Sequence, residues 1–472
     1  MTDEAAAEGW DGFADVLVIG AGGCGLVAAL AAAEAGADVA VVEKLERLAG
    51  NTMLSSGSIP AAGTRFQKAA GIDDDPGRFA ADLRRVSGAH EAEHLTDRLA
   101  EVSAEMVEWL VDAMGVDLRL ITEYRHVGHS VNRLHAPPSR RGSDLMSGLW
   151  RAVETRGIPV AFASPAVELV TSQDGAVIGA VTGGARSDMS RIRAGAVVLA
   201  TNGFGGNREL LRRFCPEVAP VSYFGALGSE GEAVLWGERL GARLANMGAY
   251  QAHAGIAQPH GALVTWTVIE KGGVIVNESG QRFADETVGY SAFAAHALRQ
   301  KGPIYAIYDA RIRDATAAGQ EEFADLCKHG GCSEAADIAA VAALCGFDAK
   351  SGHDTIARAG QAARGAIADP FGRTAWGLGP LEPPYVVTRI APALFHTQGG
   401  LAVDRDARVL RSDNRPIQGL YAGGGAAAGI SGARGSLGYS SGNGLLAALG
   451  LGFIAGRAAA AHAIARAHKA AE

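Results

Sequence analysis

The sequence predicts an α/β protein that has a parallel sheet in one domain and a second, inserted lobe. Short β-branched runs alternate with apolar segments of helical length, and three of these runs lead directly into glycine-rich turns. The composition also changes after Ala249. At roughly 100–200 residues per domain, the 472 residues are enough for two domains or for one large domain with an insertion.

The composition is that of an ordinary globular chain, with 48% hydrophobic and 20% charged residues. The 43 basic and 51 acidic residues give a formal charge of −8 without a basic run, which argues against nucleic-acid binding. The acidic N-terminus, MTDEAAAEGW, is unlike a signal peptide. The most apolar stretches, Leu26–Ala33 and Leu445–Ala455, are shorter than the roughly 18 residues of a membrane span. We therefore expect a cytoplasmic protein with no integral membrane segment.

The cysteines are odd in number and scattered along the chain: Cys24, Cys215, Cys327, Cys332 and Cys345. This pattern predicts reduced thiols rather than a disulfide framework. Cys327 and Cys332 flank a short turn, but no second ligand pair follows at the spacing of a zinc site. We therefore expect no metal.

The N-terminal segment has the pattern of a dinucleotide-binding unit. Asp15–Ile19 reads as a buried strand, Leu26–Gly36 as an apolar helix, and Asp38–Val42 as a second strand that ends at Glu43. Between the first strand and the helix stand Gly20, Gly22 and Gly25 in a GxGxxG spacing. Such glycines allow a tight turn and a close approach of the backbone to a pyrophosphate at the helix N-terminus, while the acid binds ribose hydroxyls. The combination predicts dinucleotide binding.

Three further segments repeat the glycine pattern. Gly50-Asn51-Thr52 and Ser55-Ser56-Gly57 follow soon after the acid, which suits a ligand longer than NAD. A buried strand then leads into Thr201-Asn202-Gly203, and Gly419–Gly425 leads toward Gly442-Asn443-Gly444 at the start of a long apolar helix.

These motifs resemble the fumarate reductase / 3-ketosteroid dehydrogenase family of FAD-containing oxidoreductases, over Asp15 to about Arg457. The resemblance implies a discontinuous Rossmann-like FAD-binding domain with an inserted α+β capping domain. It places 1–247 in the first part of the FAD-binding domain, 248–393 in the capping domain and 394–472 in the last part. Some relatives attach the flavin to a histidine in the Gly50–Ser56 region. This sequence has none between Gly50 and Gly57, which implies non-covalent FAD.

The motifs and the resemblance together give a set of expected FAD-binding residues from five segments of the chain. They are Gly20, Gly22, Gly25, Glu43, Lys44, Gly50, Asn51, Thr52, Ser55, Ser56, Gly57, Ala200, Thr201, Asn202, Gly203, Gly423, Gly424, Ser441, Asn443 and Leu445. Only one strict GxGxxG is present. We therefore expect a quinone or a carrier, rather than NADPH, as the external electron acceptor.

The fumarate-reducing branch clamps a dicarboxylate with two arginines and two histidines, because a buried dianion must be neutralised. The resemblance places its histidines at His253, in a QAH segment, and at His396, in an HTxGG segment. Its proton-donating arginine falls on Tyr290, and its last clamp arginine falls on Tyr439. The acid and the second arginine of its proton relay fall on Trp266 and Ile269.

Two tyrosines thus stand at the positions of two arginines of the fumarate-reducing branch. Tyrosines at these positions resemble the ketosteroid-dehydrogenating branch. The spacing of Tyr439 and Ser441 resembles the enzymes that introduce a Δ4 double bond. In that chemistry Tyr439 polarises the ketone oxygen with help from a backbone N–H, and Tyr290 takes the α-proton directly or through a relay. His396 departs from the steroid pattern, and a loop shift would bring Arg434 into the clamp in place of Tyr439.

The predicted catalytic residues are therefore Tyr290, Tyr439, Ser441, His253 and His396. The predicted reaction is the FAD-dependent formation of a C=C bond α,β to a ketone of a small cyclic or steroid-like molecule. Two alternatives stay open. One is a fumarate-reductase-like reductase of an unsaturated carboxylic acid, and the other is a non-catalytic protein that kept the fold to bind a partner. Tyr124, His126 and His129 lie on a segment that could line the cavity, whereas Tyr305 and Tyr308 are expected in the core.

Overall fold

The computed structural model describes residues 9–183 and 189–471, which form two compact units. Unit 1 comprises the chain up to Ala219, Phe224–Tyr250 and the chain from His396 onward, and unit 2 comprises Pro220–Tyr223 and Gln251–Phe395. The sequence places the inserted lobe at 248–393. It also assigns 220–223 to the FAD-binding domain, whereas in the structure these residues group with unit 2, since strand β10 (Ser222–Tyr223) pairs with Ala393 and Leu394 of strand β16 (Tyr385–Thr397).

The main sheet of unit 1 has the strand order β18-β19-β9-β1-β2-β6. Its core is parallel: β1 (Gly12–Ile19) lies between β2 (Val39–Val42) and β9 (Ser190–Leu199), with Val18 opposite both Val41 and Val198. β6 (Val160–Ala161) and β19 (Pro416–Ala422) extend the parallel part. β18 (Arg408–Leu410) and the hairpin of β7 (Ala166–Thr171) and β8 (Val177–Thr182) pair antiparallel. The predicted parallel sheet of an α/β fold is confirmed.

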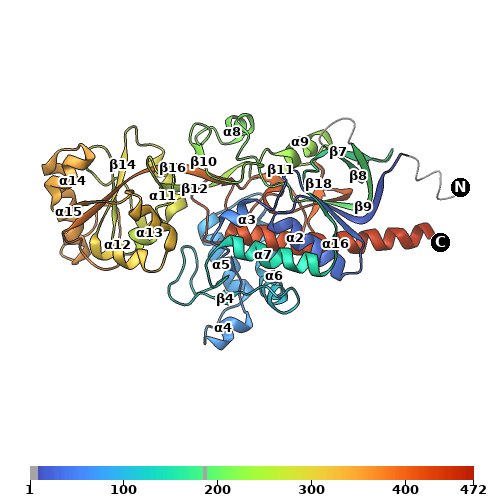
Figure 1. Ribbon diagram of the computed structural model, residues 1–472, viewed down its shortest axis with the longest axis horizontal. Helices are drawn as coiled ribbons and strands as arrows, with labels where there is room; N and C mark the ends of the chain where they lie inside the picture. Colours follow the sequence, from blue (N-terminus) through green and yellow to red (C-terminus); the bar gives the residue numbers. More distant parts are fainter. Residues whose placement is uncertain (1–8, 184–188, 472) are drawn as a thin grey trace. The chain divides into compact units, whose positions relative to one another are not determined.

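Helices cover this sheet. Figure 1 shows α16 (Asn443–Ala471), α2 (Gly23–Glu34) and α7 (Gly142–Thr155) side by side, with α5 (Pro76–Ser87) and α6 (Glu93–Asp112) next to them. The first ten residues of α2 are buried, which explains its uniformly apolar sequence. α2 and α16 pack very closely, since a Cβ added at Gly456 of α16 would lie 2.2 Å from the carbonyl oxygen of Ala28.

The smaller elements of unit 1 complete it. They are α3 (Asn51–Leu54), α4 (Arg65–Ala69), α8 (Arg208–Phe214), α9 (Glu232–Arg239), the three-stranded sheet of β3 (Ile59–Pro60), β5 (Leu134–Ala136) and β4 (Arg119–Leu120), and the pair β11 (Leu244–Ala245) and β17 (Gly400–Leu401).

α16 is longer than the apolar stretch that the sequence suggested. Asn443–His468 is long and apolar enough to cross a membrane by length and composition alone, with a mean hydropathy of 1.6. However, 72% of its most apolar window is buried inside the protein, as in the central helix of a globular core. The buried contacts with α2 account for the apolar composition.

Unit 2 contains a second sheet, in which β13 (Val274–Val276), β14 (Ile304–Asp309), β16 and β12 (Gly248–Ala257) are neighbours. β15 (Ser333–Ala335) pairs with β16. Its helices are α10 (Thr267–Glu270), α11 (Tyr290–Ala297), α12 (Ala310–Ala317), α13 (Glu321–Lys328), α14 (Ile338–Cys345) and α15 (Ala349–Ala363). Tyr305 and Tyr308 are buried on β14, as predicted. β12 and β16 each contain one of the points where the chain passes from one unit to the other.

The prediction of reduced thiols is wrong for one pair. Cys327 and Cys332 form a disulfide, because the turn between them brings their Cα atoms to 4.8 Å, within the range of such bonds. Cys24, Cys215 and Cys345 are free and buried.

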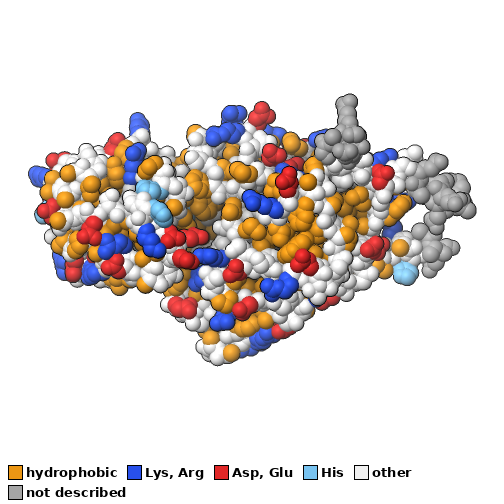
Figure 2. All heavy atoms as spheres, viewed as in Figure 1, with side chains coloured by type: hydrophobic (Ala, Val, Ile, Leu, Met, Phe, Trp, Pro, Cys, Tyr) orange, Lys and Arg blue, Asp and Glu red, His pale blue; other side chains and the backbone are white. Residues whose placement is uncertain are grey.

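The surface carries charges of both signs. On the face shown in Figure 2, lysine and arginine side chains are interspersed with aspartate and glutamate rather than gathered in a basic patch.

Candidate functional site

The turn between β1 and α2 has the geometry that a pyrophosphate needs. Gly20 adopts φ +107, and a Cβ there would lie 2.5 Å from the carbonyl oxygen of Ala200. A Cβ on Gly25 would lie 1.8 Å from the carbonyl oxygen of Gly20, so helix and strand can meet at this point only because residue 25 has no side chain. Gly22 is the N-cap of α2, and nothing would crowd a Cβ there. The N-terminus of α2 can therefore receive an anion.

Glu43 stands at the end of β2 and is held by two backbone groups. Its Oε2 accepts from the N–H of Ala21 at 2.8 Å, and its Oε1 accepts from that of Leu45 at 2.9 Å. This arrangement aims the carboxylate at the glycine turn. Lys44 forms ion pairs with Glu232 and, at 3.3 Å, with Glu230.

The structure brings together the predicted cofactor segments from distant parts of the chain. The Asn51 side-chain amide donates to Oδ1 of Asn202 at 3.2 Å, and Asn202 has the left-handed φ of 65. A Cβ on Gly23 would lie 2.6 Å from Oγ1 of Thr52. Gly423 and Gly424 lie beside Cys24 of α2. All of these contacts are within unit 1.

The other predicted cofactor residues lie in the same region or extend it. The hydroxyl of Ser55 donates to the Thr52 carbonyl at 2.7 Å and accepts from the N–H of Gly57 at 3.0 Å, while the hydroxyl of Ser56 lies 3.0 Å from that of Ser58. Gly50 precedes α3 with φ +113. Ala200, Thr201 and Gly203 follow β9, and Asn443 and Leu445 begin α16.

Two orphaned polar atoms support the fit of a cofactor to this region. Oγ1 of Thr201 and Oδ1 of Asn443 are buried and have no hydrogen-bond partner among the described residues. Buried polar atoms are normally paired, so each of these is available to a hydrogen-bonding group of a ligand or to a water. Both belong to the predicted cofactor set. The glycine turn, the helix N-terminus and the aimed carboxylate supply the other features that FAD requires.

Within unit 1, His396 and Tyr439 meet at the start of α16. Their rings are 5.7 Å apart in an edge-to-face arrangement, and the N–H of Gly444 donates to the Tyr439 hydroxyl at 3.3 Å. Burial raises the pKa of Tyr439 to about 12, so its hydroxyl stays protonated at neutral pH and can serve as a donor. Burial lowers the pKa of His396 to about 4, so this ring is neutral.

The backbone of Ser441 is held on both sides by the segment that precedes β5. Its N–H donates to the carbonyl oxygen of Val127 at 3.0 Å, and its carbonyl oxygen accepts from Nε2 of His129 at 2.8 Å. Nδ1 of His129 faces a guanidinium N–H of Arg133 at 3.5 Å, so it accepts and the ring proton is on Nε2. Burial lowers the pKa of His129 to about 4. This neutral histidine therefore positions the predicted catalytic serine.

Arg133 is the centre of a buried ion cluster behind His129. It is fully buried and donates to Asp74 through two bonds of 2.7 and 2.8 Å and to Asp82 through one of 2.6 Å. Burial would raise the pKa of Asp82, but hydrogen bonds from Ser130, Arg133 and Arg85 lower it well below its usual range. The cluster fixes the segment that holds Ser441.

Within unit 2, His253 and Tyr290 form an aromatic stack. The His253 ring lies between Tyr290, at 5.0 Å, and Phe395, at 5.5 Å, and meets the edge of Trp266 at 5.8 Å. Its Nδ1 accepts from the N–H of Gly255 at 3.0 Å, and burial lowers its pKa to about 3. His253 is therefore neutral with its proton on Nε2, and its ring stacks face to face on that of Tyr290.

The arginines that lie near Trp266 and Ile269 in unit 2 are already paired. Arg282 donates to Glu286 at 2.8 and 2.6 Å and pairs with Asp369. Arg373 pairs with Glu286 at 3.2 Å and donates to the carbonyl oxygen of Ile269 at 2.9 Å. Two cations and two carboxylates balance, so this cluster has no net charge. Neither Arg282 nor Arg373 is therefore free to act as the cation of a proton relay beside Trp266 and Ile269.

Arg434, the residue that a loop shift would bring into the clamp, is exposed on β20 (Arg434–Gly435), where it pairs with Gly248 of β12. Tyr439, not Arg434, is the residue next to His396.

Sequence reasoning did not select Arg140. It is a non-glycine residue with φ 58, and its side chain meets Tyr124 and His126. Neither the left-handed backbone nor the contact had a signal in the sequence.

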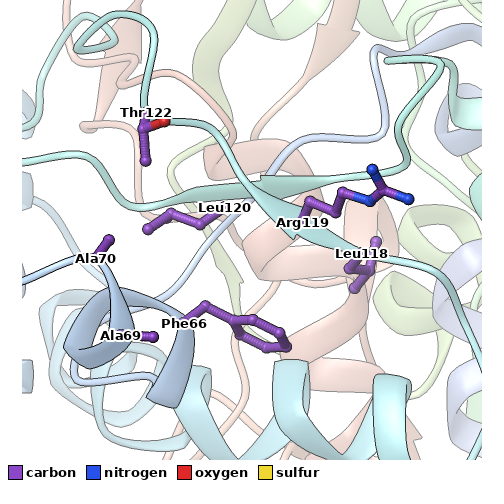
Figure 3. A pocket seen from close by; sticks show the side chains of 7 residues that line it. All are labelled: Phe66, Ala69, Ala70, Leu118, Arg119, Leu120 and Thr122. Carbon is purple, nitrogen blue, oxygen red and sulfur yellow. The ribbon is translucent and has the colours of Figure 1, made fainter.

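A shallow hollow of about 340 Å³ lies elsewhere on unit 1. Figure 3 shows that it lies between α4 and β4 and is lined by Phe66, Ala69, Ala70, Leu118, Arg119, Leu120 and Thr122. None of the predicted site residues lines it.

The comparisons with known proteins agree with the geometry of unit 1. The chain matches the family model described as FAD binding domain over residues 15–441. It is 31% identical to a probable fumarate reductase, Ifc3, of Shewanella frigidimarina, over 98% of this chain and 77% of the relative. It is 32% identical to urocanate reductase of Eggerthella lenta, over 89% of this chain and 70% of the relative. Among solved structures it is similar to 3-ketosteroid-delta4-(5alpha)-dehydrogenase of Rhodococcus jostii, with 26% identity, a TM-score of 0.77 and coverage of 97% and 98%.

Proposed function

Because the chain belongs to the FAD binding domain family and is an FAD-dependent oxidoreductase, we propose that it acts on the carbon–carbon bond next to the carbonyl of a cyclic or steroid-like ketone. The observation that carries this proposal is the Tyr439 group. A protonated phenol, whose oxygen accepts from the N–H of Gly444 at 3.3 Å, stands where the resemblance puts a clamp arginine. A neutral donor of this kind suits a ketone oxygen on which charge develops.

The proposed roles of the chain's residues follow from this donor. Tyr439 hydrogen-bonds the ketone oxygen and so acidifies the α C–H. Tyr290 takes the α-proton, directly or through a hydroxyl relay, and the C=C bond forms as the β-hydrogen leaves with its electron pair. Bound FAD supplies the hydride acceptor at N5. His253 fixes the Tyr290 ring by stacking, and His129 fixes the backbone of Ser441.

Electrostatics argue against a dicarboxylate at these residues. His253 and His396 are neutral at pH 7 because burial lowers their pKa values to about 3 and about 4. The resemblance puts tyrosines at the two arginine positions, and Arg282 and Arg373 are already paired with carboxylates. An unpaired buried charge costs several kcal/mol, so a dianion would bind poorly.

A second candidate is an FAD-dependent reductase of an unsaturated carboxylic acid. The names of the relatives favour it, since both are reductases, and His253 and His396 stand in the motifs of that branch. We place it second because the resemblance puts tyrosines, not arginines, at the two clamp positions.

One anaerobic experiment separates the two candidates. The oxidised enzyme is mixed with a saturated cyclic ketone, and the reduced enzyme is mixed with either the conjugated enone or fumarate, while flavin absorbance is followed. We expect the ketone to bleach the flavin and the enone to reoxidise it at least about a hundredfold faster than fumarate does. Rapid reoxidation by fumarate, abolished by Arg434→Ala, would instead establish the second candidate.

A further inference from the structure

Arg140 has an unusual backbone conformation close to the predicted site. It lies in the turn between Pro137 and Gly142 with φ 58, a left-handed conformation that side chains other than glycine seldom adopt. Its N–H donates to the Pro137 carbonyl at 2.9 Å, so the turn is closed by the backbone itself. Residues held in such conformations concentrate at ligand-binding sites, and this one carries a cation.

The Arg140 guanidinium has neutral neighbours. One of its terminal N–H groups donates to the Tyr124 hydroxyl at 2.9 Å and faces Nε2 of His126 at 3.4 Å. The Tyr124 and His126 rings pack 4.4 Å apart. Within residues 9–183 and 189–471, no carboxylate forms an ion pair with Arg140. The cluster of Tyr124, His126 and Arg140 therefore carries one uncompensated positive charge.

Two buried N–H donors in this cluster have no acceptor. Nε of Arg140 and Nδ1 of His126 are both buried and lack a hydrogen-bond partner in the described part of the chain. Burial and the nearby Arg140 lower the pKa of His126 to about 3, so its ring is neutral and carries one N–H. Because Nε2 faces the Arg140 donor, that N–H is at Nδ1. Buried donors are costly to leave unpaired, so an acceptor from outside the chain is expected.

The cluster adjoins the segments that carry the predicted catalysis. Val127, next to His126, accepts from the N–H of Ser441 at 3.0 Å. A Cβ on Gly128 would touch Ser440 at 2.4 Å. On the other side, the carbonyl oxygen of Arg141 would lie 3.1 Å from a Cβ on Gly57. All of these residues are in unit 1.

We propose that Arg140, with Tyr124 and His126, forms a binding subsite for one carboxylate of the substrate. A carboxylate is the acceptor that best suits a guanidinium and a second N–H donor, because it has two anionic oxygens and pairs with arginine through charge-assisted bonds. The single positive charge of Arg140 matches the single negative charge of one carboxylate. This inference rests on the proposed function and narrows its substrate to a ring ketone, or the matching enone, that bears a single carboxylate away from the reacting bond.

The test compares an acid with its neutral ester. The probes are 4-oxocyclohexane-1-carboxylate and its methyl ester, and the readouts are Kd by calorimetry on the oxidised holoenzyme and the rate of flavin reduction. We expect the wild type to bind the acid about ten- to a hundredfold more tightly than the ester. In Arg140→Gly the acid should lose this advantage while the Kd of the ester stays unchanged. Glycine tolerates φ 58, so this variant should keep its fold.

Arg125→Ala is the matched control, because Arg125 is an exposed arginine of the same segment. It should leave the acid-to-ester ratio at the wild-type value. An unchanged ratio in Arg140→Gly, or an equal loss in Arg125→Ala, would overturn the subsite. If both probes bind with the expected ratio but neither reduces the flavin, the subsite stands and the proposed ketone chemistry fails.

Discussion

Replacing Arg133 by methionine is expected to destabilise the protein by about 3–5 kcal/mol at pH 7. Arg133 is fully buried and bonds to Asp74 and Asp82 at 2.6–2.8 Å. Methionine fills much of the volume but leaves two carboxylates without their cation. Removing one partner of a buried ion pair costs this much because the remaining charge has lost both its solvation and its counter-ion. The thermal midpoint should fall by roughly 3–7 °C.

The loss should depend on pH in a specific direction. In the wild type, hydrogen bonds including that from Arg133 lower the pKa of Asp82 against the effect of burial. In the variant, burial should dominate and raise the pKa of this carboxyl above its ordinary value. The variant therefore binds a proton more readily when folded than when unfolded. Its stability should rise relative to the wild type as pH falls from 7 toward 5.

Urea unfolding at pH 7 and pH 5, with intrinsic fluorescence as the readout, measures both effects. The control is Arg65→Met, which breaks the exposed pair of Arg65 with Asp112 and should leave the stability close to the wild-type value at either pH, because water screens this pair. A loss below about 1 kcal/mol in Arg133→Met, or a difference from the wild type that grows as pH falls, would refute the reasoning about the buried cluster.

Three further outcomes are expected. The purified protein should be yellow and should release its flavin on acid or heat denaturation, since no histidine stands between Gly50 and Gly57; flavin that stays with the denatured chain would contradict non-covalent binding. Tyr290→Phe should keep FAD but slow substrate-driven flavin reduction by at least about a hundredfold. The control Tyr305→Phe, in the core, should leave the rate of flavin reduction unchanged. Equal rates for the wild type and Tyr290→Phe would mean that Tyr290 only packs. Burial lowers the pKa values of His129 and His135 to about 4, so each folded ring binds fewer protons than the unfolded one between pH 6.5 and 4. Stability should fall in that window as pH is lowered, by up to about 1.4 kcal/mol per pH unit for each ring, and a flat urea midpoint from pH 7 to 5 would contradict this.

The sequence alone determined the dinucleotide-binding part of this protein. Gly20, Gly22, Gly25 and Glu43 lie within one strand–helix–strand unit, and each residue's role follows from the local backbone. The resemblance of the chain then extended this reading to FAD and to the other glycine segments. The sequence did not show that Cys327 and Cys332 form a disulfide, because their number and spacing also suit free thiols.

Only the tertiary structure decided the electrostatics of the candidate site. The charge state of His253 and His396 depends on how deeply other segments bury them. Whether Arg373 is free to bind a substrate anion depends on Glu286 and on the carbonyl of Ile269, which both pair with it. These partners lie 87 and 104 residues away in the sequence, so no local pattern reveals them. The contact of Arg140 with Tyr124 and His126 depends on a left-handed backbone conformation at Arg140, which no pattern in the sequence predicts. The charge of a titratable side chain depends on its burial and on partners distant in the sequence, and neither can be predicted from the neighbouring residues.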